Sequence, residues 1–406
     1  MKADNKDNWQ VTVATSFEEI QSIRHDWEKK HTDEDFPTLN ADIERYLTVL
    51  GVESPGMQPY IMVFSNKGIT SGIVIGRIET RQIQCRLGYK TVWKSSLRCL
   101  TIVYGGIFGE QTEGFCVKII AQLQSILKSG TVDMVYLNYL KTDSVIYRLA
   151  KTTPNFLCKE HFLKPTLHWQ TNVSGSAESF YETIPSKQKR EIRRCERRLA
   201  EAADGHLKIS CYQQEKDVDY ILKAACDISA STYKNAMDIG IVDNALTRSL
   251  LTQAARSNML RAYILYVKDV PCAFEFGCHY GRTFFVEYMG YDPKWKAFGL
   301  GMILWAKVIE DICSDHSVDI LDYGFGNAAY KEKFGTKSWL ESSVYIFAPR
   351  AYPICINLSR QITTCLSAVL EHLANKAGIR DWVKKKWRNL AQKNSKSDSE
   401  ILHKAD

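Results

Sequence analysis

The 406-residue chain lacks the sequence patterns of membrane and secreted proteins. It has no stretch of about twenty residues without a charge, which a membrane-spanning helix requires. Its first ten residues, MKADNKDNWQ, contain no apolar core of a signal peptide. We therefore expect a cytoplasmic protein that is neither secreted nor embedded in a membrane.

The chain also lacks the common signatures of metal sites and serine nucleophiles. Its twelve cysteines are scattered from Cys85 to Cys365 without a Cys-x-x-Cys pair, and its nine histidines form no His-Glu-x-x-His motif. No Gly-x-Ser-x-Gly elbow occurs. We expect reduced, mostly buried thiols and a reaction that needs no metal ion.

Most of the chain carries little net charge. The formal net charge is +7, yet residues 187–198 and 380–393 each carry +5, which leaves −3 for the rest. The body of the protein is therefore nearly neutral, with two basic segments.

Apolar spacing and turn signals predict a first half built on a central sheet. The expected elements are a strand at 11–14, a helix from Ser16 to about Lys30, a hairpin at 60–78 that turns at Asn66-Lys67-Gly68, a strand at 101–104 that breaks at Gly105-Gly106, a helix at 113–127 and a buried strand at 132–137.

A second series of elements repeats this order further along the chain. A strand at 284–289 leads to a turn with Gly299 and Gly301, a helix at 302–313, a strand at 318–321 and a short helix that contains Tyr330. Both series read strand, glycine turn, helix, strand, which indicates two related halves that join near residues 174–176. The two glycines of the second turn let the backbone approach a ligand and point N–H groups outward at a helix start, where phosphate oxygens bind well.

This turn resembles the pyrophosphate loop of the GNAT N-acyltransferases. That loop reads (Arg/Gln)-x-x-Gly-x-(Gly/Ala), and Lys296-Ala-Phe-Gly-Leu-Gly301 matches it with Lys in the first position. The later segment 322–331, together with Tyr291-Asp292-Pro293, is similar to the BioF2-like or CelD-type branch, which also resembles the FemAB aminoacyltransferases. The match is strongest over residues 186–347. Lys keeps the charge of Arg but loses its two-pronged hydrogen bonding.

The repeat and the resemblance together imply an α/β (α+β) fold of tandem GNAT-like halves. Each half is expected to be a mixed central sheet flanked by helices, followed by a C-terminal helical tail. The expected domains are a degenerate half at 1–175, an acyltransferase half with the acyl-CoA site at 176–349, and a helical basic tail at 350–406 with a disordered end. The first half lacks a basic residue at the right distance before a Gly-x-Gly helix start, so we expect one active site.

Acyl transfer from a thioester to an amine needs a proton donor for the thiolate and a base for the amine. The resemblance places Tyr330 opposite the thioester sulfur, whereas packing of its short helix is the alternative role. Asp322 ends a strand at the edge where α/β sheets bind ligands, and it is a base or a structural carboxylate. Glu287 lies mid-strand among apolar residues, where a charge is costly unless it is paired, and it is a second base or a buried ion pair.

The remaining candidates bind the donor and the acceptor. The resemblance assigns the binding of acetyl-CoA or another acyl-CoA, as co-substrate, to Lys296, Phe298, Gly299, Leu300 and Gly301. Tyr291, Asp292 and Lys331 are candidates for binding the acceptor, a saccharide or other small molecule with an amine. A rigid turn at 291–293 and a solvated Lys331 are the alternatives.

Two further enzyme and binding roles stay open at this point. The basic segment 187–198 is either a solvated helix face or a contact for an acidic acceptor, or for tRNA as in the FemAB-like transferases. The segment from Trp382 to Trp387 could touch an anionic membrane surface. The first hypothesis is an acyl-CoA-dependent N-acyltransferase; the alternatives are an aminoacyl-tRNA-dependent transferase and a catalytically silent GNAT-fold binding module.

Overall fold

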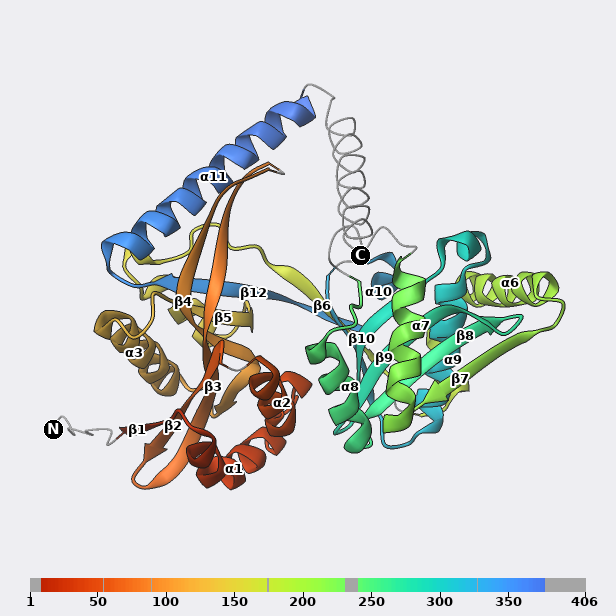
Figure 1. Cartoon of the computed structure of the whole chain (residues 1–406), viewed down its shortest axis with the longest axis horizontal. Helices are drawn as coiled ribbons and strands as arrows, with labels where there is room; N and C mark the ends of the chain where they lie inside the picture. Colours follow the sequence, from red (N-terminus) through yellow and green to blue (C-terminus); the bar gives the residue numbers. More distant parts are fainter. Residues whose placement is uncertain are drawn as a thin grey trace, which may run out of the picture. The chain divides into compact units, whose positions relative to one another are not determined.

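The computed structural model describes residues 9–53, 55–88, 90–173, 175–230, 240–326 and 328–376. The described chain divides into two units, each with its own apolar core (Figure 1). The first unit holds residues 9–166 and 340–376, and the second holds residues 167–339. These units differ from the linear segments expected from the sequence, because the chain from Leu340 onward returns to the first unit.

The described strands of the first unit pair in the order β1, β2, β3, β4, β5, β12. Their bounds are β1 (Trp9–Ala14), β2 (Met57–Asn66), β3 (Ile69–Leu87), β4 (Lys90–Gly109), β5 (Met134–Lys141) and β12 (Lys337–Phe347), the last from residue 340. Neighbours are antiparallel except β4 and β5, which run parallel. The sheet of this half is thus mixed, as predicted.

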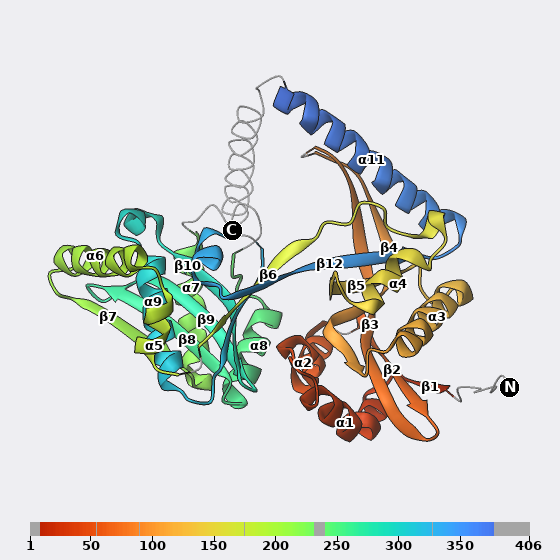
Figure 2. The same ribbon diagram turned by 180° about the vertical axis from the view of Figure 1, so that it is seen from behind.

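Helices cover both faces of this sheet (Figure 2). Alternate residues of β2 and β3 face α1 (Phe17–Thr32), η1 (Leu39–Ala41) and α2 (Ile43–Glu53) on one side, and α3 (Glu113–Ser129) and α4 (Val145–Thr152) on the other. Ser16 starts α1 with a reciprocal capping box to Glu19, which confirms the predicted helix start. The short helix η2 (Phe156–Cys158) follows α4 along the chain. The long helix α11 (Ala351–Lys376) lies along β3 and also contacts η2.

The strands of the second unit pair in the order β6, β11, β10, β9, β8, β7. Their bounds are β6 (Thr166–Asn172), β7 (Leu207–Tyr212), β8 (Leu260–Val267), β9 (Val270–Tyr280), β10 (Thr283–Tyr291) and β11 (Ile320–Phe325). Only β10 and β11 run parallel among these described pairs. This half repeats the mixed sheet of the first.

One face of the second sheet packs on four helices that share a large apolar core. These helices are α5 (Ala177–Thr183), α6 (Ser186–Ala202), α9 (Leu300–Ser314) and α10 (Ala329–Phe334). The opposite face packs on α7 (Val218–Ala230), which follows η3 (Glu215–Asp217) along the chain. The next helix, α8 (Ala245–Arg256), packs beside α7. Pro185 separates α5 from α6 and is the N-cap residue of α6.

One expectation about the chain is wrong, and another concerns residues that the structure does not describe. The glycines at 105 and 106 do not end a strand, because β4 continues to Gly109 through a bulge between its pairs Ile102↔Gly76 and Ile107↔Val74. Within the described residues, the helix expected in the tail from residue 350 is present as α11. The basic tail segment 380–393, including Trp382 and Trp387, lies outside the described residues.

In both units the parallel strand pair parts before the strands end. The pairing of β4 with β5 runs from Cys99↔Met134 to Ile102↔Leu137, and β4 then continues by seven residues. The pairing of β10 with β11 runs from Thr283↔Ile320 to Phe285↔Asp322, although β10 reaches Tyr291 and β11 reaches Phe325. Each unit therefore has an opening at the carboxyl ends of its parallel strands, where α/β sheets bind ligands.

Candidate functional site

The opening between β10 and β11 begins at a bulge that contains Glu287. The register of β10 on β9 shifts between Val286 and Tyr288, so Glu287 has no opposite residue in the ladder. Its side chain is half-buried, and the Cys278 thiol lies 3.4 Å from its Oε2. A bulge re-aims a side chain at the point where pairing stops. Glu287 thus lies where β10 leaves β11, as a base at this opening would.

The turn after β10 is built by its own residues. Asp292 caps η5 (Pro293–Phe298) by accepting a hydrogen bond from the Lys294 backbone at 3.0 Å, and its carboxylate pairs with the Lys294 ammonium at 2.8 Å. Gly299 then has φ of 71°, in the left-handed region, and a Cβ there would lie 2.9 Å from the Cys195 sulfur. The turn therefore requires glycine at 299 both for backbone conformation and for space.

The start of α9 is open to a ligand. Leu300 is buried and anchors the helix, whereas Gly301 is exposed and a Cβ there would touch only the Tyr291 ring, at 3.6 Å. The first N–H groups of a helix have no partner inside it and carry the positive end of its dipole. Lys296, exposed on η5, adds a positive charge to this turn. Phosphate oxygens fit such a helix start.

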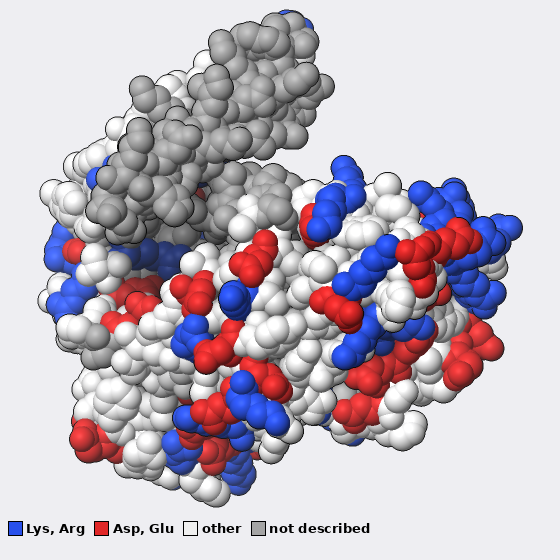
Figure 3. All heavy atoms as spheres, turned by 45° about the vertical axis from the view of Figure 1, so that its right-hand side comes forward, with Lys and Arg blue, Asp and Glu red and all other residues white. Residues whose placement is uncertain are grey.

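The basic helix α6 packs beside this turn. Its apolar side, at Ile192, Cys195 and Leu199, is buried. Cys195 borders Gly299, and the Arg198 guanidinium lies 5.5 Å from the centre of the Phe298 ring. Figure 3 shows Lys and Arg side chains, mixed with acidic ones, at the end of the second unit where α6 lies. The basic helix and the turn at 291–301 lie about a hundred residues apart in the sequence, and the fold brings them together.

Asp322, at the last pair of the opening, is fully engaged in hydrogen bonds. It is 3% exposed, and its Oδ2 lies 2.7 Å from His168 Nε2 and accepts from Gln170 at 2.9 Å. Its Oδ1 accepts from the Gly324 backbone at 2.7 Å. Because both oxygens have protein donors, the geometry favours a carboxylate that holds β6 to β11 over one that takes a proton from a substrate. The role of base, however, stays a prediction.

His168 is a site residue that the sequence did not reveal. It is buried, its ring stacks on Trp339 with centroids 4.5 Å apart, and Phe325 meets it edge-on at 4.9 Å. This packing fixes the imidazole against Asp322. A single histidine in strand 166–172 carries no motif, so no sequence signal pointed to it.

Tyr330 is half-buried on α10 next to the end of β11. Its ring lies edge-on to Tyr323, with centroids 6.1 Å apart, and it packs against the core that contains α9. Burial, followed by the nearby Glu275 carboxyl, raises the pKa of the Tyr330 phenol above its ordinary value. The phenol is therefore neutral at neutral pH and can donate a proton.

Glu275 on β9 is a second residue that the sequence did not reveal. It is 1% exposed, and its Oε1 has no hydrogen-bond partner among the described residues. Burial raises the pKa of its carboxyl from 4.5 to about 8. Glu287 became a candidate because it is a glutamate within an apolar strand. Glu275, in the apolar strand 272–279, has the same sequence feature, and the argument applies more strongly to it.

Lys331 is buried rather than solvated. Its ammonium donates to the backbone carbonyls of Tyr323 and Phe325, both at 2.6 Å. These bonds tie α10 to the end of β11, so they favour a positioning role over a direct contact with an acceptor. Tyr291 is half-exposed beside Gly301, where contact with an acceptor remains a prediction.

Apart from Glu287 on β10, the candidates thus fall into two groups within the second unit. The turn at 291–301 holds all residues assigned to acyl-CoA together with Tyr291 and Asp292. The ends of β11 and α10 hold Asp322, Tyr330 and Lys331. In the described residues no three His, Cys, Asp or Glu side chains are arranged to hold a metal ion. The twelve cysteines are free thiols and most are buried, as expected.

Comparisons with known proteins agree with this fold. Residues 186–332 match the family model of the acetyltransferase (GNAT) domain. The crystal structure of FemX matches with a TM-score of 0.55 and 7% identity, over 80% of this chain and 95% of that one. A tandem GNAT protein from the clavulanic acid biosynthesis pathway matches with a TM-score of 0.49 and 7% identity, over 84% and 100%. No curated protein matches the sequence.

The matched family segment includes the whole turn at 291–301, the opening between β10 and β11, and Tyr330. The mixed α/β fold of the sequence prediction is thereby confirmed, and the segment from α6 to α10 is similar to a GNAT acetyltransferase domain. FemX, at 7% identity, shows a shared fold and nothing more.

Proposed function

We propose that the protein is an acyl-CoA-dependent N-acyltransferase whose donor site lies in the second unit. The observation that carries the proposal is that β10, where it leaves β11, leads through the short turn η5 to the open start of α9. The helix α10 packs on both sides of this opening: Phe334 stacks on Trp305 of α9 at 3.8 Å, and Tyr330 meets Tyr323 of β11. The turn proposed for the pyrophosphate and the proposed proton donor thus belong to one set of packed elements.

The proposed donor contacts follow from charge and space. The N–H groups at Leu300 and Gly301 would hold the pyrophosphate of CoA, with Lys296 as a nearby cation. Arg198 of α6, beside Phe298, supplies further positive charge for a phosphate-rich ligand. Acyl-CoA brings an activated carbonyl to this site as a thioester.

The residues at the opening would then move two protons. The amine nitrogen bonds to the carbonyl carbon while the carbon–sulfur bond breaks, and the departing thiolate takes the phenolic proton of Tyr330. The proton lost by the amine goes to a carboxylate. We assign this base to Glu287 ahead of Asp322, because Glu287 is half-exposed at the bulge of β10, whereas Asp322 is 3% exposed and enclosed by β6 and β11. Solvent then takes the proton from Glu287 and returns one to Tyr330.

The finer assignment is an acetyl group, as the matched family's name suggests, transferred to an amine of a sugar, a polysaccharide precursor or another small molecule. The resemblance of segment 322–331 to the CelD-type branch supports a saccharide acceptor. We also propose a cytoplasmic location and a peripheral contact of the tail with an anionic membrane. Among the described helices none is both long and apolar enough to cross a bilayer.

A second candidate is transfer from aminoacyl-tRNA. The fold shared with FemX and the basic helix beside the candidate turn favour it. In that version the α6 arginines bind tRNA phosphates and release their counterions. The logarithm of the binding constant then falls steeply and linearly with the logarithm of the salt concentration. A silent binding module is the third candidate, for which Tyr330→Phe and Asp322→Asn would change no activity.

Calorimetric titration with acetyl-CoA tests the donor assignment. Gly301→Glu places a carboxylate at the proposed pyrophosphate site and is expected to abolish binding. Gly114→Glu is the matched control, because Gly114 is the exposed second residue of α3 as Gly301 is of α9, and a Cβ there meets nothing within 4 Å. Wild-type protein that binds no acyl-CoA of any chain length would contradict the proposal.

A further inference from the structure

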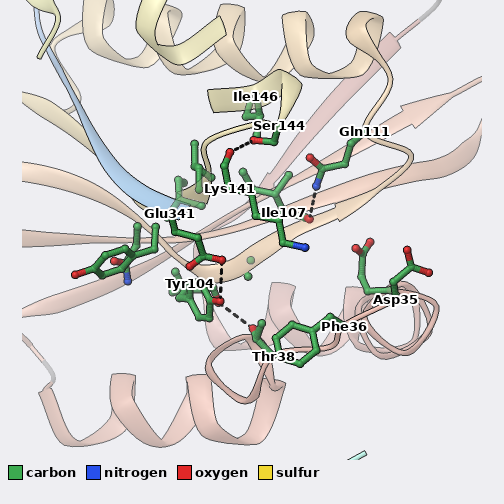
Figure 4. Close-up of a pocket in the computed structure, with 18 residues that line it drawn as sticks. Asp35, Phe36, Thr38, Tyr104, Ile107, Gln111, Lys141, Ser144, Ile146 and Glu341 are labelled. Carbon is green, nitrogen blue, oxygen red and sulfur yellow. Dashed lines mark hydrogen bonds between the residues drawn. The ribbon is translucent and has the colours of Figure 1, made fainter. Parts of the chain in front are cut away.

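The first unit has its own cavity where β4 and β5 part. The cavity has a volume of about 310 Å³ and opens beyond the last parallel pair, Ile102↔Leu137 (Figure 4). Its walls come from the segment between α1 and η1, from β4, from β5 with the start of α4, and from Glu341 on β12. It thus occupies the same place in the first sheet as the donor opening in the second.

The charged side chains around this cavity are mostly acidic. Among the lining residues, Glu34, Asp35 and Glu341 are carboxylates, and Lys141 is the one cation. Glu341 is 1% exposed and accepts a hydrogen bond from the Tyr104 hydroxyl at 3.3 Å. Glu34 is half-buried and accepts from the Gly109 backbone at 2.8 Å. Carboxylates held out of water attract a cation strongly, because little solvent screens them.

The other walls suit an organic cation rather than a bare metal ion. Phe36, Tyr104 and Tyr139 present aromatic rings, which attract ammonium groups through their negative faces. Gln111 and Asn138 add amides that can bond hydroxyl or amine groups of a ligand. A site with convergent polar groups and aromatic surface is typical of small-molecule binding.

The cavity is preformed by close packing at a glycine. Thr38 donates a hydrogen bond to the Tyr104 carbonyl at 3.0 Å, which fixes the segment after α1 above β4. Gly105 has φ of 67°, and a Cβ there would lie 2.1 Å from the Thr38 hydroxyl. Asp35 and Phe36 are thereby held on the opposite side of the hollow from Lys141 and Glu341 (Figure 4). A ligand would therefore bind with little cost for ordering the walls.

We propose that this cavity binds a small organic molecule with a primary ammonium group. The ammonium lies between Glu341 and Asp35, with its carbon frame against Phe36 and Tyr104. The lining disfavours an anion, because three carboxylates face one lysine. This site is separate from the proposed donor site, and it does not depend on the identity of the donor.

Calorimetry with two matched probes tests the proposal. Glucosamine carries an ammonium where glucose carries a hydroxyl, and putrescine is a second ammonium probe without a sugar frame. We expect an ammonium probe to bind wild-type protein about tenfold or more tighter than glucose, since each tenfold corresponds to about 1.4 kcal/mol.

Three variants locate the binding. Glu341→Gln keeps an oxygen for the Tyr104 hydroxyl but removes the buried charge, and should weaken ammonium binding by about thirtyfold. Asp35 is exposed at the rim of the cavity, so Asp35→Asn should leave the fold intact. It should weaken ammonium binding by about threefold. Asp33→Asn makes the same charge change two residues away, outside the lining, and should leave binding unchanged.

Several results would overturn the proposal. These are the failure of both ammonium probes to bind, equal binding of glucosamine and glucose, and equal effects of Asp35→Asn and Asp33→Asn. Acetyl-CoA titration of the same variants separates the two sites: it should be unchanged in Glu341→Gln even if the ammonium probes no longer bind.

Discussion

Tyr330 and Glu275 share one environment in the second unit. The phenol and the carboxyl lie near enough for Glu275 to raise the pKa of Tyr330, and burial keeps both groups in the neutral form at neutral pH. A neutral phenol is the form that can protonate a thiolate, and burial keeps the Tyr330 phenol in that form. Among the described residues, no cation lowers the pKa of either group.

Glu275→Gln should remove a pH dependence of stability. The folded-state pKa of about 8 lies above the ordinary 4.5, so the folded protein holds a proton that the unfolded chain has released between these values. The stabilising effect of this proton is complete below pH 4.5 and is lost as pH rises through 8, by up to about 1.4 kcal/mol per pH unit. Thermal unfolding from pH 5 to pH 9 should show Glu275→Gln gaining on wild type as pH rises; parallel curves would contradict this.

Tyr330→Phe should separate catalysis from binding. Loss of the phenolic proton is expected to lower kcat about a hundredfold while the Kd for acyl-CoA stays unchanged. Tyr220→Phe, which removes a hydroxyl on α7 at the opposite face of the sheet, is the control. Steady-state kinetics combined with titration measures both quantities. Unchanged kcat in Tyr330→Phe would show that this residue only packs α10.

At the scale of elements, the contact between α6 and α9 determines the shape of the donor turn. Gly299 ends η5 and caps α9, and Cys195 of α6 fills the space beside it. The basic helix can approach the turn this closely only because no side chain intervenes. Its arginines are thereby brought near the start of α9, where a phosphate would lie.

Gly299→Ala should destabilise the fold in two separable ways. The left-handed backbone costs about 1–2 kcal/mol for any residue with a Cβ, and the contact with the Cys195 sulfur adds to it. The double variant with Cys195→Ala should recover the second part only. Denaturant unfolding of the two single variants and the double variant measures the coupling. A Gly299→Ala protein as stable as wild type would contradict the described turn.

Elements formed by contiguous residues could be predicted from the sequence, and contacts between distant segments could not. The turn at 291–301 was recognisable because its glycines, lysine and helix start follow one another. The partners of Asp322 lie 152 and 154 residues earlier, on β6, where no spacing rule reaches. Glu275 and Glu287 looked alike as glutamates in apolar strands. Only the bulge in β10 leaves Glu287 half-exposed while Glu275 is enclosed.

At the scale of the whole molecule, the chain repeats one plan and then crosses back. Both units place an opening where a parallel strand pair parts, with a helix following the first strand. The first opening is lined by carboxylates and the second is bordered by the basic helix α6, so the two suit ligands of opposite charge. The return of the chain from Leu340 to the first unit was not predictable, because β12 carries no signal for its partner strand.

The most direct test of the central claim is native mass spectrometry of the purified protein, followed by titration with acetyl-CoA, longer acyl-CoAs and free CoA. The account predicts a retained or micromolar-binding CoA species that Gly301→Glu loses and Gly114→Glu keeps. Binding of aminoacyl-tRNA with steep salt dependence and without any CoA species would contradict it and assign the second unit to the alternative donor.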